Sequence, residues 1–166
     1  MKGANDWVKA LDLQPHPEGG YFRETYRSDE VISKSNLPER FSGERSFSTA
    51  IYYLLKGHDF SAFHRIHQDE VWHFYDGASL TIHVIAPDGA YSTAKLGRNI
   101  LKDELPQFIV PAGCLFAVEV NDPASYVLSG CTVAPGFDFA DFEMPPAEQL
   151  IASYPQHASL IERLTR

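Results

Sequence analysis

Apolar and polar residues alternate along most of this chain, in short runs that turn residues separate. The runs cover residues 46–55, 80–86, 91–96, 107–110, 115–120 and 125–133. A period of two places successive side chains on opposite faces of a β-strand. Strands of this length at such regular spacing predict a mainly β fold, an antiparallel sandwich or barrel rather than an α/β sheet, in which 80–86 and 91–96 form a hairpin.

The two ends of the chain have helical rather than strand periodicity. Near the N-terminus, Asn5 is expected to cap a short helix with one apolar face. Residues 145–166 hold two further amphipathic segments, each preceded by proline, which predict two C-terminal helices packed on the barrel. We therefore expect a single domain over residues 1–166, with its barrel core at 21–133.

Residues 57–77 concentrate the polar side chains that could carry chemistry. Strand alternation puts His64 and Ile66 on one face of the first half of this stretch. A polar break at 67–69 predicts a tight turn between two paired antiparallel strands. In that arrangement His64 and Glu70 point into the same enclosure, which makes them the candidate catalytic pair.

Size, charge and cysteine content limit the function classes. The chain has 166 residues, 44% hydrophobic and 13% aromatic, which suits one soluble β-rich domain. A net charge of -8 argues against nucleic acid as a partner, because phosphate binding needs a basic face. No apolar run is long enough for a membrane span, and we expect no signal peptide. Cys114 and Cys131 lie in apolar segments and predict free buried thiols in the cytoplasm.

The segment 21–28 predicts a strand with two different faces. Arg23 and Arg27 share one face, and Glu24 and Tyr26 share the other. Such a strand fits a surface edge and also the wall of a ligand cavity. If it lines a cavity, Arg23 could hold an anionic group, and only one of Arg23 and Glu24 can point inward.

Two motifs in the chain resemble those of the cupin superfamily. The first motif is matched by Gly57, His64, Glu70 and Gly77. The second is matched by Pro111, Gly113 and Phe116. The segments 13–28 and 61–77 resemble a cupin branch whose members largely lack an assigned function. The resemblance implies an antiparallel jelly-roll barrel and a homodimer paired through edge strands.

The resemblance also implies a ligand set for metal, from which this chain departs. In metal-binding cupins the ligands are two histidines and a glutamate of the first motif and one histidine of the second. Ile66 and Phe116 stand at two of these four positions. A stable mononuclear site needs three or more protein ligands, so we predict no metal cofactor. The alternative is a divalent metal held by His64, Glu70 and a displaced His67.

One segment of the chain also resembles cupin-like epimerases that act on dTDP-keto sugars. The segment 20–26 is similar to one that precedes the barrel in those enzymes, and His64 could match their catalytic base. The likeness implies that His64 removes a proton next to a carbonyl while a tyrosine returns one. Glu70 is the candidate that orients His64, and Tyr26, Tyr52 and Tyr75 are candidates for the acid.

The sequence therefore predicts a small-molecule-binding cupin whose cavity surrounds His64 and Glu70. The expected ligand is a polar cyclic molecule such as a sugar nucleotide or a nucleobase. The alternatives are a metal-independent epimerase or isomerase and a metal-dependent enzyme. The candidate ligand-binding residues are Arg23, Glu24, Tyr26, Tyr52, Ser61, Trp72, Phe74 and Phe116. We expect His16 to be an ordinary surface or turn residue. Asp138 and Asp141 could close over the barrel mouth, but we expect them to lie in a solvated connecting loop.

Overall fold

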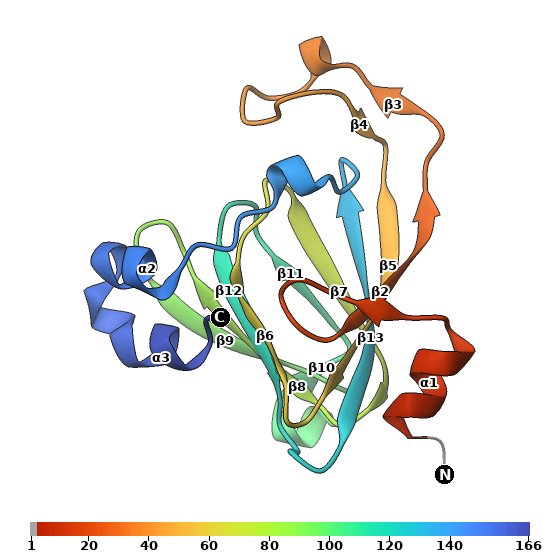
Figure 1. Ribbon diagram of the computed structural model, residues 1–166, viewed down its shortest axis with the longest axis vertical. Coiled ribbons are helices and arrows are strands. Elements are labelled where there is room, and N and C mark those ends of the chain that lie inside the picture. The colour runs from red at the N-terminus through yellow and green to blue at the C-terminus, as the bar shows by residue number, and fades with distance from the viewer. Residues whose placement is uncertain (1–2) are drawn as a thin grey trace.

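The computed structural model describes residues 3–166, which form two β-sheets packed face to face (Figure 1). The larger sheet has the order β1-β2-β5-β13-β7-β11 and the smaller one β10-β9-β8-β12-β6. The strands of the larger sheet are β1 Gln14–Pro15, β2 Tyr21–Arg27, β5 Thr49–Lys56, β7 Asp69–Gly77, β11 Gln107–Val110 and β13 Tyr126–Ala134. Those of the smaller sheet are β6 Phe60–His64, β8 Leu80–Ile85, β9 Tyr91–Leu96, β10 Glu104–Leu105 and β12 Leu115–Val120.

The pairing within these sheets confirms the predicted fold class. Neighbouring strands are antiparallel except for the short parallel pair β9 and β10. The predicted hairpin is present as β8 and β9, which pair from Leu80 to Ile85. The inward side chains of both sheets form one core, including Tyr53, Trp72 and Phe116, each nearly or fully buried. This core fills one end of the sandwich and leaves the other end for the site.

The predicted pairing of β6 with β7 is wrong. β6 pairs with β12 in the smaller sheet, whereas β7 pairs with β13 and β11 in the larger one. Residues 65–68 therefore carry the chain from one sheet to the other. His64 and Glu70 still face the same interior, as predicted, because each strand turns its inner face toward the opposite sheet.

Helices cover parts of the outer faces of both sheets. α1 Ala4–Ala10 begins after Gly3, so Asn5 is inside the helix and not its cap. α1 packs beside the larger sheet, where Leu54 and Leu128 form a small cluster with it. α2 Ala147–Ser153 and α3 Ala158–Arg163 pack on the smaller sheet, as the sequence predicts. The 3-10 helices are η1 Lys34–Asn36, η2 Ile100–Lys102, η3 Phe139–Asp141 and η4 Pro155–His157.

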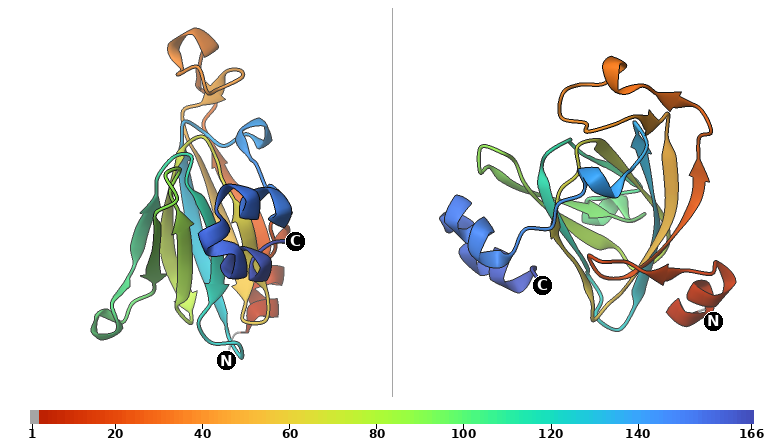
Figure 2. Two further views of the ribbon diagram at one scale, coloured as in Figure 1. Left: turned by 90° about the vertical axis from the view of Figure 1, so that its left-hand side faces the viewer. Right: turned by 45° about the horizontal axis from the view of Figure 1, so that its top comes forward.

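Two segments meet above one end of the barrel. The excursion between β2 and β5 holds the short strands β3 Val31–Ile32 and β4 Arg45–Ser46 and stands clear of the sheets (Figures 1 and 2). Residues 136–142, with η3, cross the open end (blue in Figure 2, right). A buried ion pair joins the two segments, because the Arg45 guanidinium donates to both Asp141 oxygens at 2.6 and 2.7 Å. Asp141 is therefore fully buried, and the expectation of a solvated loop residue is wrong.

Candidate functional site

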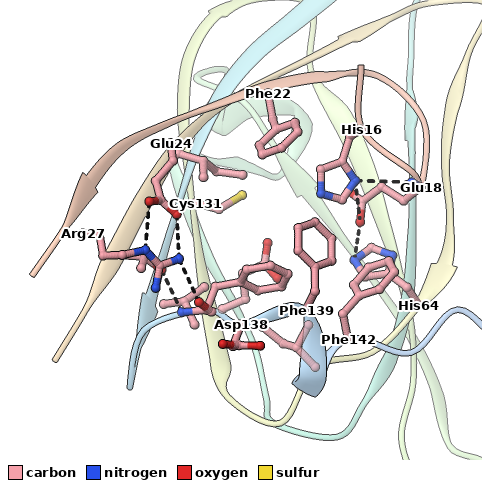
Figure 3. A pocket seen from close by; sticks show the side chains of 16 residues that line it. His16, Glu18, Phe22, Glu24, Arg27, His64, Cys131, Asp138, Phe139 and Phe142 are labelled. Atoms are coloured by element: carbon pink, nitrogen blue, oxygen red, sulfur yellow. Dashed lines mark hydrogen bonds and ion pairs between the residues drawn. The ribbon is translucent and has the colours of Figure 1, made fainter. Parts of the chain in front are cut away.

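A cavity of about 280 Å³ lies under the segment 136–142, between the two sheets. Strands β2, β5, β7 and β13 form one wall, and His64 of β6 lies on the opposite side (Figure 3). Its lining residues are His16, Glu18, Phe22, Glu24, Arg27, Thr49, Ile51, His64, Ile66, Glu70, Cys131, Val133, Phe137, Asp138, Phe139 and Phe142. The lining combines apolar side chains with several ionisable groups, as ligand sites do.

The partner of His64 is Glu18, not Glu70 as the sequence suggested. Nε2 of His64 lies 2.9 Å from Oε2 of Glu18, and Nδ1 lies 2.7 Å from the Ala62 carbonyl oxygen. A carbonyl oxygen only accepts, so Nδ1 carries a proton. An ionised Glu18 also requires a proton on Nε2, which makes His64 an imidazolium. Phe116 packs against this ring, with 4.1 Å between the ring centroids.

The pKa directions agree with a charged pair. Burial alone would lower the pKa of His64, but Glu18, with smaller contributions from Glu70 and the Ala62 carbonyl, raises it overall. Burial alone would raise the pKa of Glu18, but His64, His16 and the Ser61 hydroxyl together lower it. Both side chains are more than nine-tenths buried, so each depends on the other for its charge.

Hydrogen bonds to the backbone carbonyl oxygens of the loop hold Glu18 in place. Ala62 donates its N–H to the Glu18 carbonyl at 2.8 Å, and the Tyr53 hydroxyl donates to the Gly19 carbonyl at 2.7 Å. Gly19 has φ +113°, and a Cβ there would overlap the Phe60 carbonyl oxygen. Only glycine fits this approach of the loop to β6.

His16 is part of the site, so its interpretation as an ordinary turn residue is wrong. Its Nδ1 accepts the Glu18 backbone N–H at 3.3 Å, which leaves the proton on Nε2. Among residues 3–166, no side chain or backbone group hydrogen-bonds to that Nε2. Burial, as the largest effect, lowers the pKa of His16, so the ring is neutral near pH 7. His16 therefore offers one uncharged donor to the cavity.

Glu70 is an acid of the cavity that has no arginine or lysine partner within residues 3–166. It is 8% exposed, and burial raises its pKa to about 7, although the nearby His64 lowers it. Cys131 contacts its carboxyl group, and burial beside this acid raises the pKa of the thiol well above its usual value. A carboxyl group with a pKa near 7 exchanges protons readily at neutral pH.

A second charged pair lies at the mouth of the cavity. Arg27 donates two hydrogen bonds to Glu24, at 2.9 and 2.8 Å, and a third to the Phe137 carbonyl at 3.0 Å (Figure 3). Strict alternation predicted that Glu24 and Arg27 face opposite ways. A β-bulge between Glu24 and Tyr26 shifts the register by one residue and puts Arg27 on the side of Glu24.

Phenylalanines form the cover of the cavity. Phe137, Phe139 and Phe142 come from the segment 136–142, and Phe22 comes from β2. Phe139 contacts both other rings of the segment, with centroids 5.0 and 5.8 Å apart. These rings meet edge to face and make an apolar roof over the buried polar groups below.

The predicted site residues separate into two groups. His64, Glu70 and Glu24 line the cavity together, as expected. The other candidates are outside its lining: Arg23, Tyr26, Tyr52, Ser61, Trp72, Phe74 and Phe116. Arg23 donates to the Leu11 carbonyl at 3.1 Å on the far side of β2, and Tyr26 is 54% exposed. Trp72 shares the face of Glu70 but lies deeper, in the closed core.

The side chains do not fit the metal site of the metal-binding cupins. Ile66 lines the cavity and Phe116 packs on His64, so apolar groups occupy two ligand positions. His67 turns away, with Nδ1 3.4 Å from Asp141 Oδ1. Across residues 3–166, no group of three or more histidine, cysteine or acidic side chains is arranged to hold a metal ion. The three alternative ligands are thus not brought together.

Sequence reasoning missed Glu18, His16, Arg27 and the phenylalanine roof. The Pro-Glu-Gly-Gly sequence at 17–20 was one indication of a site. Glycine permits positive φ and a close approach of the backbone, so a glycine pair can bring the neighbouring acid against a distant strand. The aromatic run at 137–142 was another indication. Neither segment has strand periodicity, so neither pointed to a cavity.

Two antiparallel sheets that enclose a cavity with an inward histidine and glutamate define a cupin-type barrel. The family profile described as "Cupin superfamily (DUF985)" matches residues 5–145, and the chain belongs to that family. No helix within residues 3–166 is long and apolar enough to cross a membrane.

Individual relatives agree with this assignment. Uncharacterized protein YML079W of Saccharomyces cerevisiae is 32% identical over 146 residues, covering 82% of this chain and 70% of that protein. The crystal structure of protein SO0799 from Shewanella oneidensis is 42% identical with a TM-score of 0.90, over 100% of this chain and 99% of that one. A hypothetical protein from Leishmania major is 34% identical with a TM-score of 0.90, over 99% of each chain.

A more distant structure shares the fold alone. Oxalate decarboxylase from Bacillus subtilis is 15% identical with a TM-score of 0.56. The match covers 93% of this chain and 37% of that one. At this identity the likeness carries no information on the reaction.

Proposed function

We propose that this protein binds a small, single-ring organic molecule in the cavity, with Glu70 as its main hydrogen-bonding group. The observation that carries the proposal is a carboxyl group more than nine-tenths buried, facing the cavity without a cationic partner. Burying such a group costs several kcal/mol unless something compensates for it. A ligand that hydrogen-bonds to Glu70 supplies that compensation.

The size and charge of the cavity favour one ring over a sugar nucleotide. Its volume of about 280 Å³ is just below the range of roughly 300–1,000 Å³ that holds drug-sized ligands. A diphosphate also needs unpaired cationic groups. Arg27 is already bonded to Glu24, and His64 to Glu18. A molecule the size of a nucleobase or a monosaccharide fits both limits.

A ligand screen with a blocked cavity tests the proposal. Nucleobases, monosaccharides and sugar nucleotides are added singly, and the thermal unfolding midpoint is measured for the wild type and for Val133→Phe. Val133 lines the cavity, and the larger ring fills it. We expect single-ring compounds to raise the midpoint of the wild type only. Ile109→Phe, on the exposed side of β11, is the matched control. Equal shifts in all three proteins would place binding elsewhere and refute the proposal.

A proton-transfer enzyme is the second candidate, which the pKa of about 7 at Glu70 favours. We propose Glu70, rather than His64, as the base, since both His64 nitrogens already face acceptors. Glu70 would take a proton from a carbon next to a carbonyl and return it to the same enolate. Hydrogen exchange at that carbon in D₂O, followed by NMR, tests this. Exchange that persists in Glu70→Gln would exclude this role.

We also propose that the protein forms a homodimer through β2. β1 pairs only with Phe22 and Tyr21, so the outer edge of β2 from Arg23 onward lacks a partner strand in the described chain. An open edge of this kind tends to pair with another chain. Light scattering on the purified protein tests the dimer, and a monomer at micromolar concentration would refute it.

We propose a reducing compartment, the cytoplasm, as the location. Cys114 and Cys131 are both buried and free, which suits a thiol-reducing environment. Fractionation of the source cells tests the location, and recovery outside the cytoplasm would contradict it.

A further inference from the structure

We infer that the ligand is an organic cation, a flat ring bearing a positively charged N–H group that lies against Glu70 while the ring lies under the phenylalanine roof. This inference rests on the proposed function and adds the charge of the ligand to it. It follows from the way the charged side chains of the cavity are paired with one another.

Every cationic side chain that lines the cavity is already engaged. Arg27 uses two donors on Glu24 and one on the Phe137 carbonyl. His64 lies between Glu18 and the Ala62 carbonyl. His16 is held in a neutral form by the N–H that its Nδ1 accepts. An anionic ligand would therefore enter a cavity with no free cation to meet it.

The acids of the cavity are not matched in the same way. Glu18 pairs with His64, and Glu24 pairs with Arg27. Asp138 makes no ion pair of its own but lies in the field of Arg27 and Arg45, whereas no arginine or lysine acts on Glu70. Asp138 accepts the Ala140 N–H at 2.8 Å at the mouth, and Glu70 is buried beside the Cys131 thiol. The charge that is left over is negative, and a ligand cation would neutralise it. The net charge of -8 also draws cations toward the protein.

The aromatic lining suits the same ligand. Phe22, Phe137, Phe139 and Phe142 line the cavity. The face of an aromatic ring carries partial negative charge and attracts a cation, more strongly where water is excluded. Phenylalanines beside a buried acid therefore select for a positively charged, flat, apolar molecule over a neutral sugar.

Three probes with one ring and three charges test the inference. Benzamidine is cationic, benzamide is neutral and benzoate is anionic, and all have nearly the same shape. Calorimetric titration of the full chain measures their dissociation constants. We expect benzamidine to bind at least about tenfold more tightly than benzamide, as one added charge-assisted contact gives, and benzoate to bind more weakly than either.

The Glu70→Gln variant keeps the shape of the side chain and removes its charge. We expect it to lose about tenfold for benzamidine and little for benzamide. Glu148→Gln, on the exposed surface of α2, is the matched control and should leave all three constants unchanged. Equal binding of benzamidine and benzamide to the wild type, or a preference for benzoate, would overturn the charge inference but keep the proposed function. Failure of all three rings to bind at millimolar concentration would overturn both.

Discussion

Nε2 of His64 lies 2.9 Å from Oε2 of Glu18, although the two residues come from separate parts of the chain. Glu18 belongs to the loop before β2, and His64 ends β6 in the opposite sheet. The contact fixes His64 as a charged donor for Glu18, so that Glu70 faces the cavity without a cationic partner among the described residues. The division of roles between the two acids follows from this one distance.

Glu18→Gln should change the protonation of His64. Without the carboxylate, burial acts on His64 with less opposition and its pKa should fall. The free energy of unfolding should drop by about 3 kcal/mol near pH 6, as when one partner of a buried pair is removed. This loss of unfolding free energy should become smaller as the pH rises above the raised pKa of His64, because the wild-type His64 is then neutral and its ion pair with Glu18 is lost as well.

Histidine NMR titration and urea unfolding measure these two effects. Glu24→Gln is the control, because that acid is half-exposed and its pair should contribute less than about 1 kcal/mol. An unchanged pKa of His64 in Glu18→Gln would contradict the assignment of the pair.

Glu70→Gln should stabilise the protein at high pH. The pKa of Glu70 is raised from 4.5 to about 7 in the folded state, so the fold favours its protonated form. The resulting penalty starts as the pH rises through 4.5 and is complete above about 7. The penalty amounts to roughly 3 kcal/mol. Besides burial, the groups that act on the pKa of Glu70 are Glu18, His64 and Cys131.

Urea unfolding of wild type and Glu70→Gln at pH 5 and pH 8 checks this prediction. We expect the variant to be more stable than the wild type at pH 8, by up to about 3 kcal/mol, and similar at pH 5. The same difference at both pH values would mean that the pKa of Glu70 is not raised.

Arg27→Met should loosen the phenylalanine roof. Arg27 ties β2 to the segment 136–142 through the Phe137 carbonyl, and methionine keeps the length of the side chain without its donors. Cys131 lies in the cavity under that roof, so its reaction with a thiol reagent should speed up several-fold in a Cys114→Ser background.

Arg23→Met is the control for this experiment. Arg23 is on the same strand but bonds to Leu11 outside the cavity, so its loss should leave the thiol reaction unchanged. Equal rates in the two variants would show that Arg27 does not hold the roof.

Arg45→Met should destabilise the fold by about 3–5 kcal/mol, because it leaves Asp141 buried without its cation. Gln68 donates to the same carboxylate at 2.8 Å but cannot replace the charge. Urea unfolding measures the loss, and Arg45→Met with Asp141→Leu should recover part of it. Arg40→Met, at an exposed neighbour, should cost less than about 1 kcal/mol. A double variant no more stable than Arg45→Met would argue against a buried charge as the cause.

Gly19→Ala should disturb the site more than Gly113→Ala. Both glycines have positive φ, at +113° and +77°, so both substitutions strain the backbone by about 1–2 kcal/mol. Only at Gly19 does the new Cβ overlap a backbone atom, the Phe60 carbonyl oxygen. The loss of unfolding free energy should be larger there, and the pKa of His64 should fall as Glu18 is displaced. Equal losses would mean that the loop adapts to the extra atom.

The local pattern of the chain was enough to predict the longer strands, the terminal helices and the inward direction of His64, Ile66 and Glu70, but not the two-residue strands β1, β3, β4 and β10. These features depend on residues close in sequence, because alternation decides which face a side chain takes. The family motifs also pointed to His64 and Glu70. Pairing was harder, since an antiparallel hairpin and a crossing between sheets have the same local pattern, and β6 and β7 prove to be the latter.

Tertiary structure decided the partners of these residues. A bulge in β2 turned Arg27 toward Glu24, and a strand period cannot show an added residue. The loop at 16–20 and the segment 136–142 have no period, and their positions depend on contacts with distant strands. The sequence by itself determined that His64, Ile66 and Glu70 face inward, because strand alternation within a regular strand is a local property. Only the fold determined that His64 meets Glu18 and that Glu70 is left without a cation, because those contacts join residues far apart in the chain.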